Sequence, residues 1–274
     1  MQDTAVYING EWVKQSEATI PFTDGGFLYG DGVFETIRYQ NRKLFRPERH
    51  LSRLNEGMSI IQMKSHYSDE EIIVLLNETI EKNKMESGLI RLMVTRGTIT
   101  DSPWNHKGPV SLFILVKPRY AIPKLPVKVV YLEEDKYPII RYSPAIKSMN
   151  YVGNMLALRD ANAQDAYEPI FVNPTGFITE CAIRNVFYIR NNTLITPALE
   201  LGALPGVTRE AIIEIAQKIN IPVDETSISF EEINSMDEAF LSSTGAGILP
   251  CVWEGWNSDF ELTHRLMKEF KKIQ

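Results

Sequence analysis

The sequence predicts an α+β fold, because its strands and helices do not follow the regular strand–helix–strand alternation of a doubly wound sheet. An Asn9-Gly10 turn separates two short alternating segments, which indicates a hairpin near the N-terminus. Two amphipathic stretches, beginning at Pro47 and at about Asp69, then carry apolar residues at every third or fourth position, as helices do. The predicted strands of this half are 5–8, 11–14, 33–40, 89–96 and 110–117.

A change in composition at 117–126 predicts a boundary between two domains. Three prolines fall within these ten residues, and proline interrupts regular backbone hydrogen bonding. We therefore expect an N-terminal α+β domain at 1–117, a linker at 118–126 and a C-terminal domain at 127–274. The C-terminal domain is predicted to contain helices at 151–164, at 208–219 and at its end, and strands at 127–132, 168–173, 185–190 and, as the last one, about 238–241.

The overall composition argues against several classes of function. With 274 residues, 44% of them hydrophobic, the chain is long enough to bury a substantial core. A net charge of −6 and a pI near 5.4 argue against nucleic-acid binding, which usually needs a clustered basic surface. No apolar stretch has the length of a membrane helix, and two cysteines far apart in sequence suit a reducing cytoplasm. The four histidines are not spaced as metal ligands, so we expect no metal site.

Lys147 is the first candidate for chemistry. It lies among small and apolar residues at 145–150, between a predicted strand and a predicted helix. A lysine that loses its hydration there becomes a nucleophile able to form a Schiff base, whereas a lysine that keeps its hydration is an ordinary surface residue. Local sequence leaves both interpretations open.

Four further features suit an anion or a heterocyclic ring, although each also has a purely structural interpretation. Arg53 shares a helix face with His50 and has the planar fork that binds phosphate, but such a side chain is often solvated. The turn at 204–210 delivers a helix N-terminus with the Thr208 hydroxyl, and 243–247 is a second small-residue loop. Either is equally a plain turn. Glu180, which precedes a predicted strand, is either an exposed residue at the strand end or held against a protonated ring nitrogen.

The order of these features along the chain resembles the class IV aminotransferases. This family comprises the fold-type IV pyridoxal phosphate enzymes, among them branched-chain aminotransferases, D-amino acid aminotransferases and aminodeoxychorismate lyases. The likeness runs from about residue 5 to residue 272. The matching blocks are 29–35 (YGDGVFE), 53–54, 147–150 (KSMN), 179–180 with 185–187, 204–209 (LPGVTR) and 243–245.

The resemblance implies a fold, a cofactor and a set of roles. It implies a smaller N-terminal lobe, a larger C-terminal lobe with a barrel-like sheet, pyridoxal 5'-phosphate as cofactor, and a homodimer with active sites near the subunit and domain interface. Lys147 would hold the cofactor as a Schiff base and move a proton, and Glu180 would pair with the ring nitrogen. Arg53, Val207, Thr208 and Thr244 would hold the phosphate, and Leu204 would pack on the ring. The substrate side would be lined by Tyr29, Phe34, Arg38, Arg91, Gly245 and Ala246.

The resemblance favours transfer of an amino group between a small apolar amino acid, such as a branched-chain one, and a 2-keto acid such as 2-oxoglutarate. Arg38 and Arg91 match branched-chain enzymes and suit a substrate carboxylate. Leu89, Gly247 and Leu249 depart from that group, and Arg184 is bulky for its position beside Glu180. Alternatives are a D-amino acid aminotransferase, although its Arg-x-His pair is absent, an aminodeoxychorismate lyase giving 4-aminobenzoate and pyruvate, and an interaction protein without catalysis.

Overall fold

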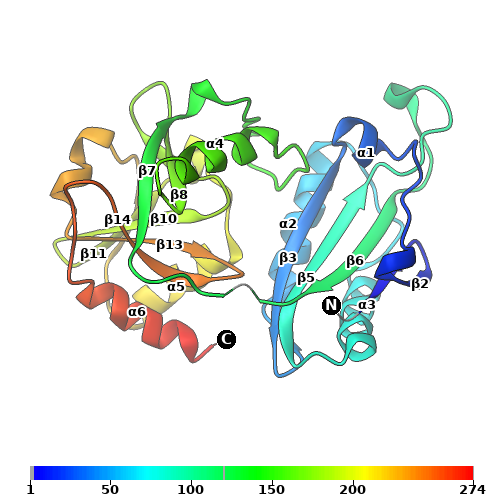
Figure 1. Ribbon diagram of the computed structural model, residues 1–274, viewed down its shortest axis with the longest axis horizontal. Helices are drawn as coiled ribbons and strands as arrows, with labels where there is room; N and C mark the ends of the chain where they lie inside the picture. Colours follow the sequence, from blue (N-terminus) through cyan, green and yellow to red (C-terminus); the bar gives the residue numbers. More distant parts are fainter. Residues whose placement is uncertain (1–2, 120, 274) are drawn as a thin grey trace. The chain divides into compact units, whose positions relative to one another are not determined.

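The computed structural model describes residues 3–119 and 121–273, which fall into two compact units. The first unit contains 3–119 together with 146–150, and the second contains 121–145 together with 151–273 (Figure 1). Within the described ranges, no helix has the length and apolar character needed to cross a membrane.

The first unit is built on one antiparallel sheet with helices packed on it. The strand order is β2-β1-β6-β5-β3-β4. Helix α2 (Pro47–Ile60) packs on β3, and α3 (Asp69–Asn83) packs on β1 and β6 (Figure 1). The strands are β1 (Ala5–Ile8), β2 (Glu11–Lys14), β3 (Gly32–Gln40), β4 (Lys43–Leu44), β5 (Ser87–Thr95) and β6 (Ser111–Lys117).

The core of this unit follows the periodicities of its sequence. Ile37 and Tyr39 of β3 face the same side as the apolar stripe of α2, represented by Leu51 and Leu54, and all four are buried. Helix α3 begins at a capping box, in which the side chains of Ser68 and Glu71 accept from each other's backbone N–H groups. The predicted hairpin and both predicted helix starts are confirmed.

A short helix that the sequence did not predict lies in the glycine-rich segment before β3. Helix α1 (Gly25–Tyr29) begins at Asp24, whose buried carboxylate accepts from the N–H groups of Gly26 and Phe27 and from the Thr95 hydroxyl. It ends at Gly30, whose φ of 68° favours glycine. Glycine disfavours helices, so the cap rather than residue propensity decides this turn.

The second unit contains an eight-stranded mixed sheet that curls on itself. The strand order is β12-β11-β10-β13-β14-β7-β8-β9, and β9 at one end also lies against β10 and β11. The α+β class is therefore confirmed. The strands are β7 (Val127–Glu133), β8 (Glu168–Val172), β9 (Ile178–Cys181), β10 (Asn185–Arg190), β11 (Thr193–Pro197), β12 (Val223–Thr226), β13 (Glu238–Ser243) and β14 (Gly247–Val252).

Among the described residues of this unit, the α-helices are α4 (Val152–Asn162), α5 (Val207–Lys218) and α6 (Glu261–Lys271) (Figure 1). The expectation that 238–241 is the last strand is wrong. This segment extends to Ser243 and turns into β14, which pairs with it in antiparallel register. Pro250 within β14 and the glycine that opens it are unusual in a strand, which is why the pattern did not indicate one.

Candidate functional site

The Lys147 segment pairs with the beginning of β3 in the first unit. The Phe34 N–H donates to the Lys147 carbonyl at 3.0 Å, and the Met149 N–H donates to the Gly32 carbonyl at 2.9 Å. Ile146 packs against the core of this unit. The side chain of Asn150 donates to the Gly30 carbonyl at 3.2 Å, which ties the segment to the end of α1. Lys147 is thus held by backbone pairing at its own carbonyl and at Met149, and by the packing of the preceding Ile146.

Two predicted cations meet at one aromatic ring. The Lys147 amine lies 4.6 Å from the centroid of the buried Phe34 ring, and the Arg91 guanidinium carbon lies 3.3 Å from it. Arg91 also donates to the Thr36 hydroxyl at 3.4 Å. Phe34, Thr36 and Arg38 project from the same side of β3 because strand residues alternate. This side of β3 therefore places cationic side chains next to an apolar ring, which suits a ligand that carries both a carboxylate and an apolar group.

A buried ion cluster lies on the opposite side of β3. Glu35 is fully buried and accepts from Arg53 Nε and Nη2 at 2.7 Å each, a bidentate pair. The Nδ1 atom of His50 lies 2.7 Å from the second carboxylate oxygen. Sequence reasoning named Arg53 and missed its partner. The indication was present, because Glu35 occupies a core-facing position between Val33 and Ile37, where a carboxylate needs a cation.

The charges in this cluster follow from burial and from its members. Burial alone would raise the pKa of Glu35, but Arg53 and then His50 outweigh it and hold that pKa well below its usual range. Burial lowers the pKa of His50, with Arg53 and Lys147 adding to the effect and Glu35 opposing it. At neutral pH we infer an ionised Glu35–Arg53 pair and a neutral His50, whose Nδ1–H donates to the carboxylate.

Two other predicted substrate residues of this unit differ in exposure. Arg38 is buried, its Nη2 donates to Gln40 at 2.7 Å, and its Nε has no partner among the described residues. Burial, with a contribution from Arg119, lowers the pKa of Arg38 to about 10. Tyr29, at the end of α1, is 57% exposed. The structure therefore buries one of them and leaves the other on the surface.

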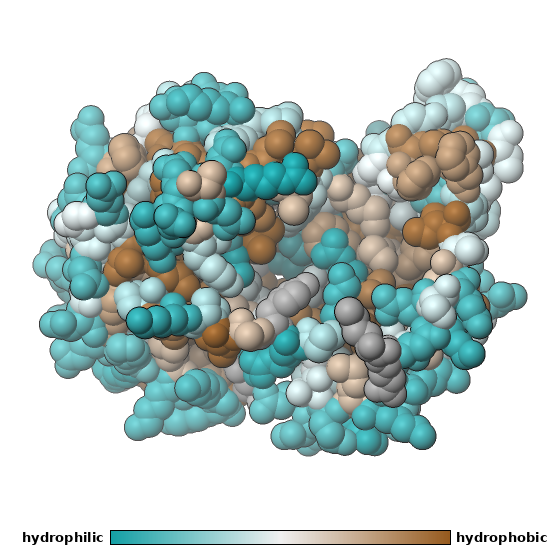
Figure 2. Space-filling model, viewed as in Figure 1, coloured by the Kyte–Doolittle hydropathy of each residue, from teal (hydrophilic) through white to brown (hydrophobic). Residues whose placement is uncertain are grey.

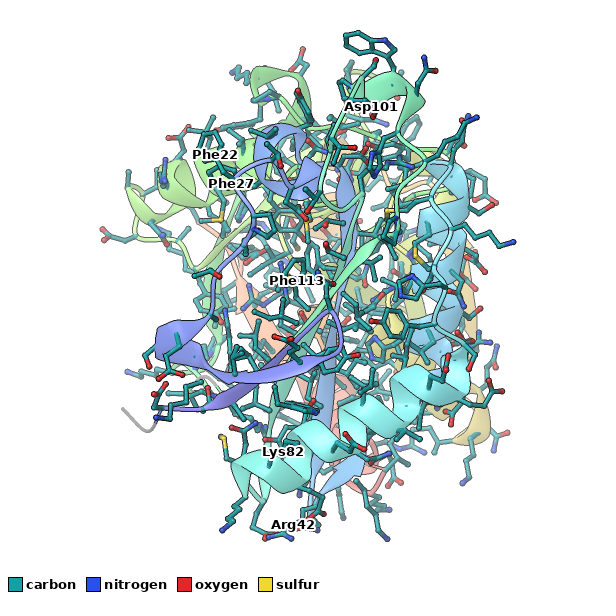
Figure 3. The ribbon with its side chains drawn as sticks, turned by 90° about the vertical axis from the view of Figure 1, so that its right-hand side faces the viewer. Phe22, Phe27, Arg42, Lys82, Asp101 and Phe113 are labelled. Atoms are coloured by element: carbon teal, nitrogen blue, oxygen red, sulfur yellow. The ribbon has the colours of Figure 1, made fainter. Side chains whose placement is uncertain are left out.

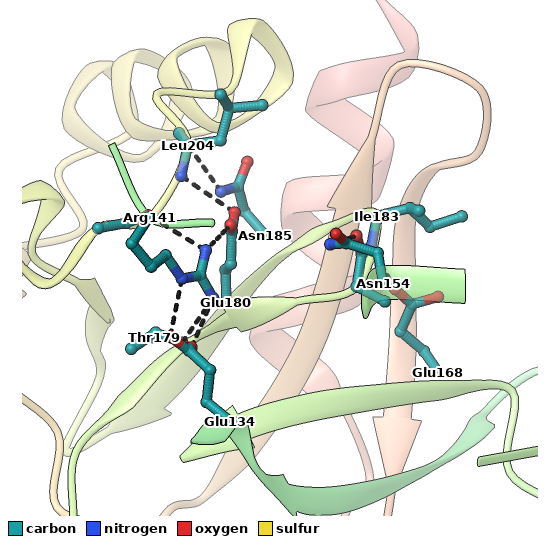
Figure 4. Close-up of polar contacts among 11 residues, drawn as sticks. Glu134, Arg141, Asn154, Glu168, Thr179, Glu180, Ile183, Asn185 and Leu204 are labelled. Atoms are coloured by element: carbon teal, nitrogen blue, oxygen red, sulfur yellow. Dashed lines mark hydrogen bonds and ion pairs between the residues drawn. The ribbon is translucent and has the colours of Figure 1, made fainter. Parts of the chain in front are cut away.

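In the second unit, Glu180 belongs to a dense polar network (Figure 4). One of its carboxylate oxygens accepts from Arg141 Nη1, and the other accepts from the Leu204 N–H at 3.0 Å. Arg141 also holds Glu134, through Nε at 2.9 Å and Nη2 at 2.6 Å. Glu134 in turn accepts from the Thr179 hydroxyl at 2.9 Å. Leu204 and Glu180, which were predicted separately, are thus joined by a hydrogen bond.

The N-terminus of α5 lies beside the end of β13. The Asn185 amide donates to the Leu204 carbonyl at 2.8 Å, and Asn185 pairs in register with Ser242 of β13. A Cβ atom at Gly206, the residue before α5, would lie 2.1 Å from Asn185 Oδ1, so only glycine allows this approach. The predicted residues 244–246 form the turn between β13 and β14.

This region has unsatisfied donors suited to a phosphate. The N-cap residue of α5 is Gly206, which has no side chain that could cap the helix, so the N–H groups of the first turn, among them those of Val207 and Thr208, have no side-chain acceptor on the N-cap residue. The hydroxyls of Thr208 and Ser242 are buried and have no hydrogen-bond partner in the described part of the chain. A helix N-terminus with two such hydroxyls fits a phosphate group, and the carboxylate of Glu180 fits a protonated ring nitrogen.

Arg184, which the sequence left in question, is engaged elsewhere. It forms an ion pair with the buried Glu168 and donates to the Tyr167 hydroxyl at 2.7 Å. Burial raises the pKa of Glu168 to about 6, although Arg184 and the Ile183 N–H oppose this rise. The bulk of Arg184 is therefore held against β8.

Comparison with known proteins assigns the family. The sequence model of the family described as amino-transferase class IV matches residues 32–252 of this chain. The chain belongs to this family. It is 30% identical to a protein of Methanocaldococcus jannaschii provisionally described as a branched-chain-amino-acid aminotransferase, over 98% of this chain and 96% of the relative. It is 34% identical to a D-alanine aminotransferase of Listeria monocytogenes, over 89% of this chain and 86% of the relative.

Solved structures agree with this assignment. A branched-chain aminotransferase of Thermoproteus uzoniensis, crystallised with norvaline, superposes with a TM-score of 0.91 at 29% identity, covering 98% of this chain and 94% of that one. A protein of Legionella pneumophila provisionally described as a 4-amino-4-deoxychorismate lyase gives 0.86 at 25% identity, covering 95% and 97%. The predictions of a class IV aminotransferase, a fold-type IV architecture and pyridoxal phosphate as the cofactor of the family are confirmed.

Proposed function

We propose that this protein transfers amino groups between a small apolar L-amino acid and a 2-keto acid such as 2-oxoglutarate. The observation that carries the proposal is the Phe34 cluster, in which Arg91 and Lys147 approach one buried aromatic ring. Arg91 can hold a substrate carboxylate, and Phe34 and the buried Leu89 offer an apolar surface for a branched side chain. The branched-chain relatives support the same substrate class.

The residues of this chain are proposed to divide the work of holding pyridoxal phosphate. Lys147 would attach it covalently, Glu180 would accept a hydrogen bond from its ring nitrogen, and Leu204 would pack on its ring. The phosphate would be bound by Arg53, by the amides of Val207 and Thr208 with the Thr208 hydroxyl, and by Thr244. Gly245 and Ala246, in the same turn as Thr244, would line the substrate side with Tyr29 and Arg38.

Proton movement follows from these assignments. The bound cofactor supplies an electron sink that stabilises negative charge at the substrate Cα. Lys147, once its amine is released, would remove the proton from that carbon and return a proton to the cofactor side, acting as general base and then as general acid. Arg91 would fix the carboxylate during this transfer, which keeps the Cα–H bond aimed at the Lys147 amine.

A single-turnover experiment tests the proposal. Protein loaded with pyridoxal phosphate is mixed with L-leucine alone, and the visible absorbance is followed. Conversion of the cofactor to its aminated form predicts loss of the visible band and a rise in the near ultraviolet, and addition of 2-oxoglutarate should restore the visible band. An unchanged spectrum with L-leucine and L-valine would refute the proposed transfer from small apolar L-amino acids, and an unchanged spectrum with D-alanine as well would count against an amino-acid transaminase.

Two other substrates are favoured by particular likenesses. The 34% identity to D-alanine aminotransferase favours a D-amino acid, and the likeness to the Legionella structure favours aminodeoxychorismate. The same spectra separate them: conversion by D-alanine and not by L-leucine supports the first. Release of pyruvate and 4-aminobenzoate from aminodeoxychorismate, without conversion by either amino acid, supports the second.

We also propose that the chain forms a homodimer. Exposed apolar side chains gather around α1, where Phe22 is 77% and Phe27 64% exposed, with ring centroids 5.8 Å apart (Figures 2 and 3). Leu28 and Tyr29 extend the same patch. Soluble monomers rarely expose such contiguous surfaces, whereas homodimers bury them. Sedimentation should give a dimer, and Phe27→Asp should shift it to monomer. A monomeric wild-type protein would refute this proposal.

A further inference from the structure

We propose that Arg141 is the positioning residue of Glu180, fixing the carboxylate that we assign to the ring nitrogen of pyridoxal phosphate. The inference rests on the proposed function, because it takes the role of Glu180 from it. Its own basis is the network in Figure 4, in which Arg141 is the one described side chain that bridges Glu180 to a second carboxylate.

The geometry of Arg141 restricts Glu180 to one orientation. Nη1 donates to one oxygen of Glu180 and, at 3.2 Å, to the Gly202 carbonyl. The second oxygen of Glu180 accepts from the Leu204 N–H, which itself opens the turn that leads into α5. A carboxylate held through both oxygens cannot rotate freely, and each oxygen keeps a lone pair for a further donor.

Glu134 in turn fixes Arg141. Nε and Nη2 form a bidentate pair with its carboxylate, and Nη2 also lies 3.3 Å from the Thr179 hydroxyl. Only 23% of the Arg141 side chain and 13% of each glutamate side chain are exposed, so water competes weakly for these bonds. The whole guanidinium fork is therefore occupied, and its plane is set by groups other than Glu180.

Charge gives Arg141 a second effect on Glu180. The network holds two carboxylates and one guanidinium, and Glu134 and Glu180 together raise the pKa of Arg141 despite its burial, so that it stays a cation. Without this cation the two carboxylates would face each other across a poorly hydrated site. Arg141 thus supplies both the orientation of Glu180 and the counter-charge that allows it to remain in place.

The test is a double-variant cycle on the affinity of the full chain for pyridoxal phosphate, measured by equilibrium dialysis. Arg141→Gln should weaken binding about 10- to 100-fold, the range typical of residues that orient a binding side chain. If Arg141 acts through Glu180, Arg141→Gln should add less than about twofold in a Glu180→Ala background. If the loss of affinity in the double variant equals the product of the losses in the two single variants, the inference is overturned.

Controls separate positioning from a general loss of structure. Arg184→Gln breaks a more deeply buried arginine–glutamate pair of the same unit, at Glu168, and should lower the melting temperature while changing affinity less than about twofold. An equal loss of affinity in this variant would overturn the inference. Arg141→Lys keeps the charge without the fork and should recover little affinity, whereas full recovery would contradict the geometric argument.

The same data distinguish the inference from the proposed function. Unchanged affinity in Glu180→Ala would refute the assigned contact of Glu180 with the ring nitrogen, on which the positioning role of Arg141 depends. Weakened affinity in Glu180→Ala, combined with normal affinity in Arg141→Gln, would leave the proposed function standing and refute the positioning role of Arg141.

Discussion

Replacement of Glu35 by glutamine should destabilise the protein strongly, because it leaves the Arg53 guanidinium buried without a counter-charge. Glu35 is fully buried and makes three bonds of 2.7 Å, two to Arg53 and one to His50. Breaking a buried ion pair on one side costs about 3–5 kcal/mol, a large part of the roughly 5–15 kcal/mol of a typical domain.

The assay is urea denaturation followed by fluorescence and circular dichroism, with free energies compared at a common slope. Glu86→Gln is the matched control: it breaks a 2.9 Å pair with Arg42 in the same unit, but that pair is exposed and should contribute about 1 kcal/mol or less. The double variant Glu35→Leu/Arg53→Met removes both charges and should be more stable than Glu35→Leu alone. A loss below about 1 kcal/mol for Glu35→Gln would refute the reasoning.

Three further predictions concern pH, a helix cap and a close approach. Burial lowers the pKa of His50 below the unfolded value of 6.5, so its contribution to stability is present above pH 6.5 and is lost as the pH falls. His50→Gln should therefore flatten this part of the curve of unfolding free energy against pH. An unchanged slope would contradict the prediction. The Glu238 carboxylate accepts hydrogen bonds from the Leu262 and Thr263 N–H groups in the first turn of α6, at 2.7 Å each. Glu238→Ala should therefore lower the free energy of unfolding by about 1–2 kcal/mol, measured by thermal unfolding. An unchanged melting temperature would argue against this cap. Gly206→Ala places a Cβ atom 2.1 Å from the Asn185 side-chain oxygen and should displace the start of α5. The affinity for pyridoxal phosphate should then fall by about tenfold or more. An affinity equal to that of the wild type would show that this turn does not hold the phosphate.

The sequence predicted those elements whose pattern was strong. Helices α2 and α3 carry regular apolar stripes, and the hairpin of β1 and β2 has an Asn9-Gly10 turn, so their positions were foreseen closely. Strand β12 was not predicted because Val223–Thr226 is short and polar, and β14 was not predicted because it contains Pro250. These strands are determined by their pairing with β11 and β13, which no local pattern records.

The candidate site was predictable where the family resemblance matched single residues. Partners that come together only in the fold were not. Arg141 lies in an irregular segment without periodicity, and nothing in its neighbours indicates that it meets Glu134 and Glu180. Likewise, the pairing of the Lys147 segment with β3 joins parts of the chain that are far apart in sequence, and the proline-rich composition at 117–126 predicted only that a boundary lies between them.

Borohydride trapping tests the central claim most directly. The full chain is loaded with pyridoxal phosphate, reduced, digested and mapped by mass spectrometry. A stable cofactor adduct on the peptide that contains Lys147, and its absence in Lys147→Ala, is the predicted result. A protein that stays colourless, or an adduct confined to another lysine, would contradict the assignment of Lys147 and the chemistry built on it.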